Sequence, residues 1–253
     1  FAAQRDEGLK SIAVGIRDVP IDLFVDLRDV SSIPYFLDGD GGGNRKLRSL
    51  LGNLLNKGDV FYDIGANIGA ISAVAVKAVG SKGRVVAVEP NPFLRKNLQK
   101  SFEHQENFDL VPVAIGKSEG DQSFFLSEKS ALSGFNSIGQ KIDVRTITLL
   151  SLLEENGKPD VIKIDVEGAE DEVFAGSYGA LEGGNCPIIV FEALTQDELE
   201  KSKKAILQMH GAIGDFYHVV SNGRISDISH EKVSSDYLYV PRHLAYRSEG
   251  LLI

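Results

Sequence analysis

The stretch from Val60 to Val74, VFYDIGANIGAISAV, constrains the fold of this chain more than any other. A short apolar segment ends at Asp63, Gly65 and Gly69 follow on either side of Asn67, and an apolar segment of helical length comes next. This order is typical of a strand, a tight turn and a helix in a parallel sheet. The glycines predict a turn in which the backbone takes positive φ and approaches a ligand closely.

Strand and helix patterns alternate after this stretch. The segments with strand patterns are 60–64, 84–90, 109–116, 160–166 and 187–194, and those with helix patterns are 70–79, 92–102, 169–181 and 196–211. Repeated units of this kind predict an α/β fold whose mostly parallel sheet is covered on both faces. The segment 117–148 breaks the alternation and is expected to form an excursion beside the sheet.

The two ends of the chain differ from this pattern. Residues 1–57 are of mixed type and are expected to form an N-terminal cap, followed by one large domain at 58–253. Within the cap, 11–16 and 21–27 read as strands, and the glycine-rich run 38–46 reads as a mobile or ligand-facing turn. Near the other end, 216–226 and 236–241 read as edge strands, with a turn at Asn222-Gly223.

Charge and composition limit the partners. The formal net charge is −9 and no cluster of lysine and arginine is present, which disfavours a nucleic acid and favours a small-molecule or glycan acceptor. The single cysteine, Cys186, excludes an internal disulfide and a cysteine-based zinc site. No apolar run reaches the roughly 18 residues of a membrane span, and no signal peptide is visible. We therefore expect a cytoplasmic protein, with its oligomeric state left open.

The glycine turn departs from a dinucleotide fingerprint. G-x-G-x-x-G would require a glycine where the chain has Asn67, which weakens an NAD interpretation. Glu89 lies twenty residues after Gly69, at the end of the second strand, where a carboxylate accepts hydrogen bonds from ribose hydroxyls. The helix N-terminus after the turn favours an anion. The pattern therefore predicts a cofactor with a ribose and a small anionic group.

Acidic side chains also follow the fourth and fifth strands. Asp165 and Glu167 end the fourth strand and Glu192 ends the fifth, so all three are expected on one rim of the sheet. Lys163 lies on the same strand face as Asp165, and this pair also fits a structural ion pair. The five histidines have no metal-ligand spacing, so we predict no metal site. Oxygen ligation of a divalent cation by the three acids remains an alternative.

Four segments in this order, FYDIGANIG, VVAVEPNP, VPVAIG and VIKIDVEGAE, resemble the FkbM-type S-adenosylmethionine-dependent methyltransferases over residues 58–241. The resemblance implies a Rossmann-like class I methyltransferase sheet of seven strands, mostly parallel, that ends in an antiparallel hairpin. It also implies O-methylation of a sugar or natural-product hydroxyl. Residues 1–57 lie outside the resemblance.

The same resemblance implies roles for single residues. The turn Gly65–Gly69 would hold the methionine part of S-adenosylmethionine, and Glu89 its ribose. The residues expected to bind the cofactor are Asp63, Gly65, Ala66, Asn67, Gly69, Glu89, Pro90, Asn91, Ala114, Ile115 and Asp165. A hydroxyl acceptor needs a base. Glu167 is the preferred candidate, with Glu192 behind it, while Asp165 would contact the cofactor's ammonium or orient the acceptor.

Three alternatives stay open. An NAD(P)-dependent oxidoreductase would use the same sheet, although the missing glycine opposes it. A Mg²⁺-dependent O-methyltransferase would polarise the acceptor hydroxyl with a metal ion. A domain that binds the cofactor without turnover would serve as a partner surface instead of an enzyme.

Overall fold

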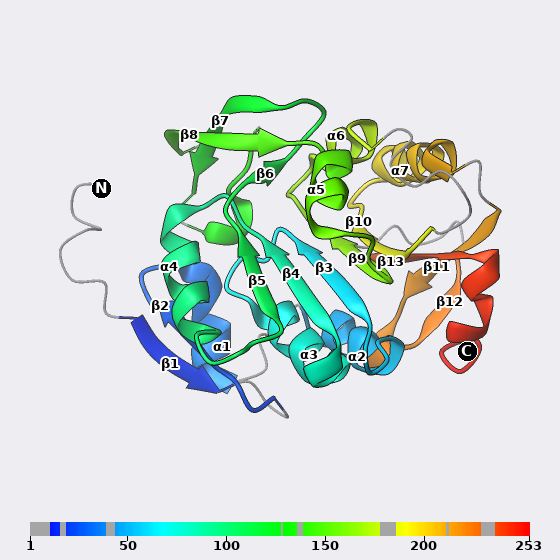
Figure 1. Ribbon diagram of the computed structural model, residues 1–253, viewed down its shortest axis with the longest axis horizontal. Coiled ribbons are helices and arrows are strands. Elements are labelled where there is room, and N and C mark those ends of the chain that lie inside the picture. The colour runs from blue at the N-terminus through cyan, green and yellow to red at the C-terminus, as the bar shows by residue number, and fades with distance from the viewer. Residues whose placement is uncertain are drawn as a thin grey trace.

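The computed structural model of the chain describes residues 11–15, 19–38, 44–127, 129–135, 139–177, 186–210, 213–228 and 236–253. A central sheet runs through the molecule, with helices on both of its faces (Figure 1). Of the described helices, none has the length and apolar character needed to cross a membrane.

Eight strands form the main sheet, in the order β12-β11-β13-β10-β9-β3-β4-β5. Their bounds are β3 (Val60–Ile64), β4 (Arg84–Val88), β5 (Phe108–Val111), β9 (Val161–Ile164), β10 (Ile188–Glu192), β11 (Gly214–Val219), β12 (Ile225–Asp227) and β13 (Asp236–Pro241). The five strands from β10 to β5 are parallel, and β13 is antiparallel to both of its neighbours. Strand order reverses between β3 and β9, and ligands of open α/β sheets bind at the carboxyl ends of strands at such a point.

Helices cover both faces because neighbouring residues of the central strands point to opposite sides. In β3, Phe61 belongs to the core shared with α2, α3 and α4, whereas Tyr62 and Ile64 belong to the core shared with α5, α6 and α7. The helices are α2 (Arg45–Leu54), α3 (Ala70–Val79), α4 (Pro92–Ser101), α5 (Leu149–Asn156), α6 (Glu170–Ala175) and α7 (Gln196–His210). Short 3₁₀ helices lie at Val30–Ser32, Gly80–Lys82, Ser130–Leu132, Ser221–Gly223 and Arg242–Arg247.

The excursion predicted for 117–148 is confirmed. A three-stranded sheet of order β6-β8-β7 lies beside the main sheet, formed by β6 (Ala114–Ile115), β7 (Gly120–Leu126) and β8 (Gln140–Ile147) (Figure 1). The single strand predicted over 109–116 is wrong, since β5 and β6 belong to different sheets. Pro112 separates them, because proline has no N–H to donate to a strand ladder.

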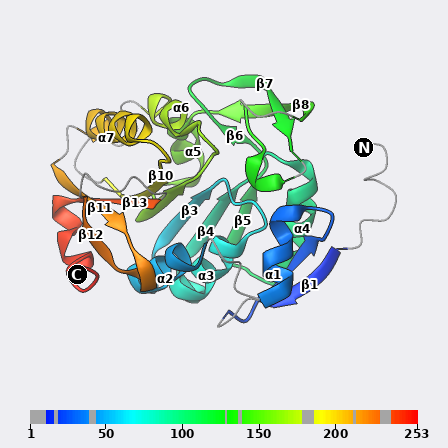
Figure 2. The ribbon, with the colours of Figure 1, turned by 180° about the vertical axis from the view of Figure 1, so that it is seen from behind.

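The N-terminal strands at 11–16 and 21–27 are confirmed as β1 (Ser11–Gly15) and β2 (Asp22–Asp26), which form an antiparallel hairpin. The hairpin lies beside α4 (Figure 2), where the backbone N–H of Phe24 donates to the Ser101 hydroxyl at 2.8 Å. Two helices that were not predicted follow, α1 (Ile33–Asp38) and α2. Of the glycine-rich run, residues 39–43 lie outside the described part.

The last strands correct the predicted edge position. β13 lies inside the sheet between β10 and β11, and the described edge on that side is β12. The predicted turn is confirmed, since Asn222 and Gly223 have φ of 60° and 68°. Of the helix predicted over 169–181, Glu170–Ala175 is helical and 178–185 lie outside the described residues. Helix α5 was not predicted.

Candidate functional site

A cavity of about 430 Å³ lies at the carboxyl ends of β3, β4, β9 and β10. Its floor is the turn after β3, and its sides are the ends of the neighbouring strands together with the small sheet. The lining includes ten of the residues predicted to bind a cofactor or catalyse: Gly65, Ala66, Asn67, Glu89, Pro90, Ala114, Ile115, Asp165, Glu167 and Glu192. The sequence therefore predicted residues that the fold brings together.

The turn after β3 needs glycine because other backbone and side-chain atoms press against it. Gly65 has φ of 79°, and a Cβ there would lie 1.9 Å from the carbonyl oxygen of Asp165. Gly69 has φ of 87°, and its Cβ would lie 2.7 Å from Leu98 and Phe102 at α4. In the structure Gly69 therefore packs against α4, and Gly65 packs against the end of β9.

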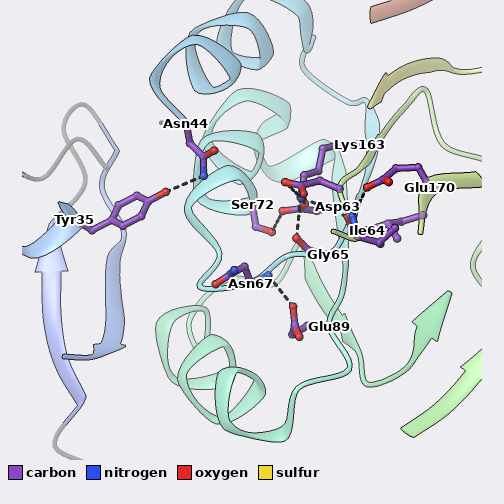
Figure 3. Close-up of polar contacts among 12 residues, drawn as sticks. Tyr35, Asn44, Asp63, Ile64, Gly65, Asn67, Ser72, Glu89, Lys163 and Glu170 are labelled. Carbon is purple, nitrogen blue, oxygen red and sulfur yellow. Dashed lines mark hydrogen bonds and ion pairs between the residues drawn. The ribbon is translucent and has the colours of Figure 1, made fainter. Parts of the chain in front are cut away.

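Lys163 ties the turn to the end of β9. Its ammonium is buried and pairs with Asp63 at 3.2 Å and with Asp165 at 3.4 Å (Figure 3). It also donates to the carbonyl oxygen of Gly65 at 2.8 Å. Burial alone would lower the pKa of Lys163, but the charges of Asp165 and Asp63 outweigh it and raise the pKa above its ordinary value. The lysine is therefore a permanent cation beneath the cavity.

Three predicted cofactor residues support the cavity without lining it. Asp63 is fully buried and accepts a hydrogen bond from the Ser72 hydroxyl at 2.6 Å, besides pairing with Lys163. The Asn91 side chain caps α4 by accepting from the N–H of Phe93 at 3.0 Å. Gly69 is the third of these residues and faces α4.

Glu89 is buried at the end of β4, where it faces both the cavity and the turn. Its carboxylate accepts from the backbone N–H of Asn67 at 2.8 Å (Figure 3). It also accepts from the backbone N–H of Asn91, again at 2.8 Å. Burial raises the pKa of Glu89 to about 7, although both hydrogen bonds work against this shift. Each carboxylate oxygen keeps a lone pair for a further donor, such as a hydroxyl of the cavity's occupant.

The side of the cavity beyond Glu89 is apolar. Val113, Ala114 and Ile115 line it from the start of the small sheet, and Phe124 and Phe135 complete it from β7 and the segment after it. The two phenylalanine rings meet edge to face, with centroids 5.8 Å apart. This slot suits a flat, apolar or aromatic group.

Two acids on the rim have pKa values raised to near neutral pH. Burial, together with the charges of Asp165 and Glu170, raises the pKa of Glu167 to about 7. Burial, together with the charges of Asp165 and Glu167, raises the pKa of Glu192 to about 8. The Glu167 backbone has φ of 57°, a conformation that is rare for a residue with a side chain and that occurs repeatedly at functional sites.

The loop that carries Glu167 is fixed by the next helix. Glu170 lies in the first turn of α6. Its buried side chain also accepts a hydrogen bond from the backbone N–H of Val166 at 3.0 Å (Figure 3). This contact holds the chain between the end of β9 and the start of α6.

The cavity has a roof that the sequence did not predict. It consists of Ser31, Pro34, Tyr35 and Asn44 from the N-terminal segment and of Ser130 and Ser133 from the β7–β8 connection. Both parts are joined to each other and to the turn, since Asp29 accepts from the N–H of Ser130 at 3.0 Å and the Ser130 hydroxyl donates to Asn67 at 3.1 Å. The glycine-rich run that ends near Asn44 was the one local signal for this roof.

The described acids of the cavity are not arranged as a metal site. Within the described ranges, no group of three or more histidine, cysteine, aspartate or glutamate side chains is arranged to hold a metal ion. Asp165, Glu167 and Glu192, the trio left open by the sequence, do not form such a group.

Comparison with known proteins decides the family. The model of the methyltransferase FkbM domain matches residues 63–219. The chain belongs to the FkbM methyltransferase family. The match begins at Asp63 and covers the glycine turn, Glu89 and all three rim acids, so the resemblance drawn from the sequence is confirmed.

Two relatives add to this result. The chain is 32% identical to the hexuronic acid methyltransferase AglP of Haloferax volcanii over 157 residues, which cover 60% of this chain and 63% of that enzyme. The crystal structure of the methyltransferase FkbM from Methylobacillus flagellatus superposes with a TM-score of 0.52 at 16% identity, over 72% of this chain and 43% of the other. The second likeness confirms the predicted fold class, and the main sheet has eight described strands where seven were expected, because β12 adds an edge strand. The chain thus spans less than two thirds of either relative.

The family match also divides the cavity. The floor, the apolar slot and the rim acids lie within residues 63–219, whereas the N-terminal part of the roof lies before the matched region. The boundary predicted at residue 57 separates the same two parts and stays a prediction. In the fold, however, Leu50 and Leu54 of α2 share one core with α3, so the N-terminal segment is packed into the domain.

Proposed function

We propose that the chain is an S-adenosylmethionine-dependent O-methyltransferase that acts on a hydroxyl of a sugar or another natural-product small molecule. The observation that carries this proposal is the cavity at the strand ends, where Glu89 binds the glycine turn and the carboxyl groups of Glu167 and Glu192 lie on the rim. The raised pKa values of the two rim acids support it. Family membership supports methyl transfer, and the name of AglP supports a sugar acceptor.

The residues present fit the cofactor. The apolar slot between Ala114 and Phe135 suits the adenine, and Glu89 has lone pairs for the two ribose hydroxyls. The turn at Gly65 allows the backbone to approach the amino-acid part closely, and Asp165 offers a carboxylate to its ammonium. When bound, S-adenosylmethionine supplies a methyl group on a positively charged sulfur.

Glu167 is proposed as the base. When an acceptor hydroxyl is methylated, the Glu167 carboxylate would take up its proton. A base whose pKa lies near the working pH is most effective, and such catalysis contributes about 10²- to 10⁴-fold. The charges of Asp165 and Glu167 also act on Glu192, whose pKa is higher than that of Glu167. Glu192 would therefore stay protonated when Glu167 is ionised.

The first test is thermal melting with S-adenosylmethionine, S-adenosylhomocysteine or NAD(P). A ligand at 100 times its dissociation constant stabilises a protein by about 2.7 kcal/mol, which in a chain of this size raises the melting temperature by roughly 5 to 10 °C. Stabilisation by the two sulfur compounds alone supports the proposal. Stabilisation by NAD(P) alone would overturn it.

The second test is turnover on a panel of neutral sugars, uronic acids and hydroxylated aromatics. Glu167→Gln should lower kcat by about 10²-fold or more and leave the affinity for S-adenosylhomocysteine nearly unchanged. Asp171→Asn, on the exposed side of α6, is the matched control and should be fully active. A fully active Glu167→Gln enzyme would refute the assignment of the base.

The panel also separates the alternatives. Loss of activity after chelation, with recovery on adding Mg²⁺, would favour a metal-dependent O-methyltransferase. Cofactor binding without turnover on any acceptor would favour a domain that serves as a partner surface.

A further inference from the structure

The roof of the cavity contains a pair of polar side chains, the buried Tyr35 from α1 and the half-buried Asn44 at the start of α2. Tyr35 is only 5% exposed, and both residues line the cavity. The Asn44 amide nitrogen donates to the Tyr35 hydroxyl at 2.9 Å (Figure 3). Neither residue lies in the part of the chain that the family match covers.

The direction of this hydrogen bond leaves a donor available. An amide nitrogen can only donate, so the Tyr35 oxygen is the acceptor and the hydroxyl proton remains unused. Among the residues that the structure describes, Tyr35 makes no other hydrogen bond. A buried hydroxyl proton without an acceptor is costly, and at the wall of a cavity it points to an acceptor on the occupant.

The surrounding charges favour an anion with a cation next to it. Burial raises the pKa of Tyr35, while the positive charges of Arg48 and Lys163 oppose the shift and Asp165 supports it, so the phenol is a neutral donor at pH 7. The first turn of α2 contains no acid, and its N-terminal end adds positive potential. Two cations, one carboxylate and a helix terminus therefore contribute to the electrostatic potential at the Tyr35 hydroxyl.

An α-amino acid group has the complementary charges, an anionic carboxylate beside a cationic ammonium. We propose that the Tyr35 hydroxyl binds the carboxylate of the cofactor's amino-acid part, with Asn44 holding the hydroxyl in position and Asp165 binding the ammonium. The inference rests on the proposed function, because it takes the occupant to be S-adenosylmethionine. It assigns the N-terminal segment, whose role the sequence left open, to cofactor binding.

Two ligands that differ in the amino-acid part alone provide the test. S-adenosylhomocysteine contains that part, whereas 5′-methylthioadenosine has the same adenosine and sulfur without it. Their dissociation constants are measured by calorimetry for the wild type, for Tyr35→Phe and for Tyr62→Phe. Tyr62 is the matched control, since it is a buried tyrosine whose hydroxyl donates to the carbonyl of Gly157 at 2.6 Å, and it does not line the cavity.

Tyr35→Phe should bind S-adenosylhomocysteine roughly 10-fold or more weakly, because a hydrogen bond to a charged group is lost. Its affinity for 5′-methylthioadenosine should match the wild type, which also shows that the variant is folded. Asn44→Ala keeps the phenol but frees its orientation, and should weaken S-adenosylhomocysteine binding by a smaller factor without affecting 5′-methylthioadenosine. Tyr62→Phe should bind both ligands like the wild type.

The remaining outcomes overturn the inference and are distinguishable. An equal loss for both ligands in Tyr35→Phe would make the tyrosine a structural support of the cavity. Unchanged binding of both would place the hydroxyl away from the cofactor. A wild-type protein that binds neither ligand would instead refute the proposed function itself.

Discussion

Replacing Gly65 by alanine tests whether the turn is built against the end of β9. The new Cβ would lie 1.9 Å from the Asp165 carbonyl oxygen, and Cβ atoms essentially never approach another atom closer than 3.0 Å. The positive φ costs an alanine about 1 to 2 kcal/mol. The turn must also move away from the carbonyl, which should destabilise the protein by about 1 to 3 kcal/mol more, the cost of inserting extra atoms into a packed core.

Gly58→Ala is the matched control at the other end of β3. Gly58 also has positive φ, 93°, but a Cβ there would meet nothing within 4 Å. Gly58→Ala should therefore lower the free energy of unfolding only by the cost of the positive φ, about 1 to 2 kcal/mol. Gly65→Ala should lower it by about 2 to 5 kcal/mol in all. With about 2 to 4 °C for each kcal/mol in a chain of this size, Gly65→Ala should melt roughly 2 to 12 °C below Gly58→Ala.

Thermal unfolding followed by circular dichroism measures this difference, and calorimetry with S-adenosylhomocysteine measures the site. Binding should be lost in Gly65→Ala and kept in Gly58→Ala, because only the first substitution moves the floor of the cavity. If the two variants melt together and bind alike, the contact between Gly65 and the Asp165 carbonyl does not shape the turn.

Three further predictions follow from the buried charges. Lys163→Met leaves the fully buried Asp63 without its cation and should cost about 3 to 5 kcal/mol, measured by urea unfolding. Glu89→Gln can accept from only one of its two N–H donors, so it should weaken S-adenosylhomocysteine and 5′-methylthioadenosine alike, by roughly tenfold. Burial and neighbouring acids raise the pKa of Glu167 to about 7 and of Glu192 to about 8, from 4.5. The folded protein then binds more protons than the unfolded chain between about pH 4.5 and 8, so stability should fall as pH rises through this window, and less steeply in the double glutamine variant.

Each of these has an outcome that contradicts it. Lys201→Met removes an exposed ion pair with Asp197 and should cost less than about 1 kcal/mol. An equal loss of stability in both lysine variants would show that the buried ion pairs of Lys163 stabilise the fold no more than an exposed pair does. If Glu89→Gln binds 5′-methylthioadenosine as tightly as the wild type does, the Glu89 carboxylate does not bind the ribose. A stability that rises from pH 5 to pH 8 would mean that other groups outweigh the rim acids.

The central sheet was predictable because its signals are local. Each βα unit shows its strand, turn and helix in about thirty consecutive residues, and Asn91 with Pro92 marks the start of α4 as in the structure. The order of strands and the position of β13 depend on contacts between distant segments, which no single stretch of sequence records. Helix α5 was missed for a different reason, since Leu149–Asn156 has only two turns and follows β8 directly.

The candidate site divides in the same way. Glu89, Asp165, Glu167 and Glu192 were predicted because strand ends of a parallel sheet meet at one edge, so position along the chain gives position in space. The residue types did not reveal which acids would line the cavity and which would support it. Asp63 also ends a strand, yet it is fully buried and paired with Lys163, so it supports the cavity without lining it.

The contacts at Lys163 imply that the cofactor and acceptor sides of the cavity are not independent. One ammonium pairs with Asp165 and donates to the Gly65 carbonyl, and the Asp165 carbonyl in turn packs against Gly65. The turn that approaches the cofactor and the loop that carries Glu167 therefore share one support. A change that moves the turn must also move the proposed base, so substitutions at Gly65 or Lys163 should lower cofactor affinity and kcat together, whereas Glu167→Gln should lower kcat alone. Measuring both quantities in the three variants separates the shared support from the base.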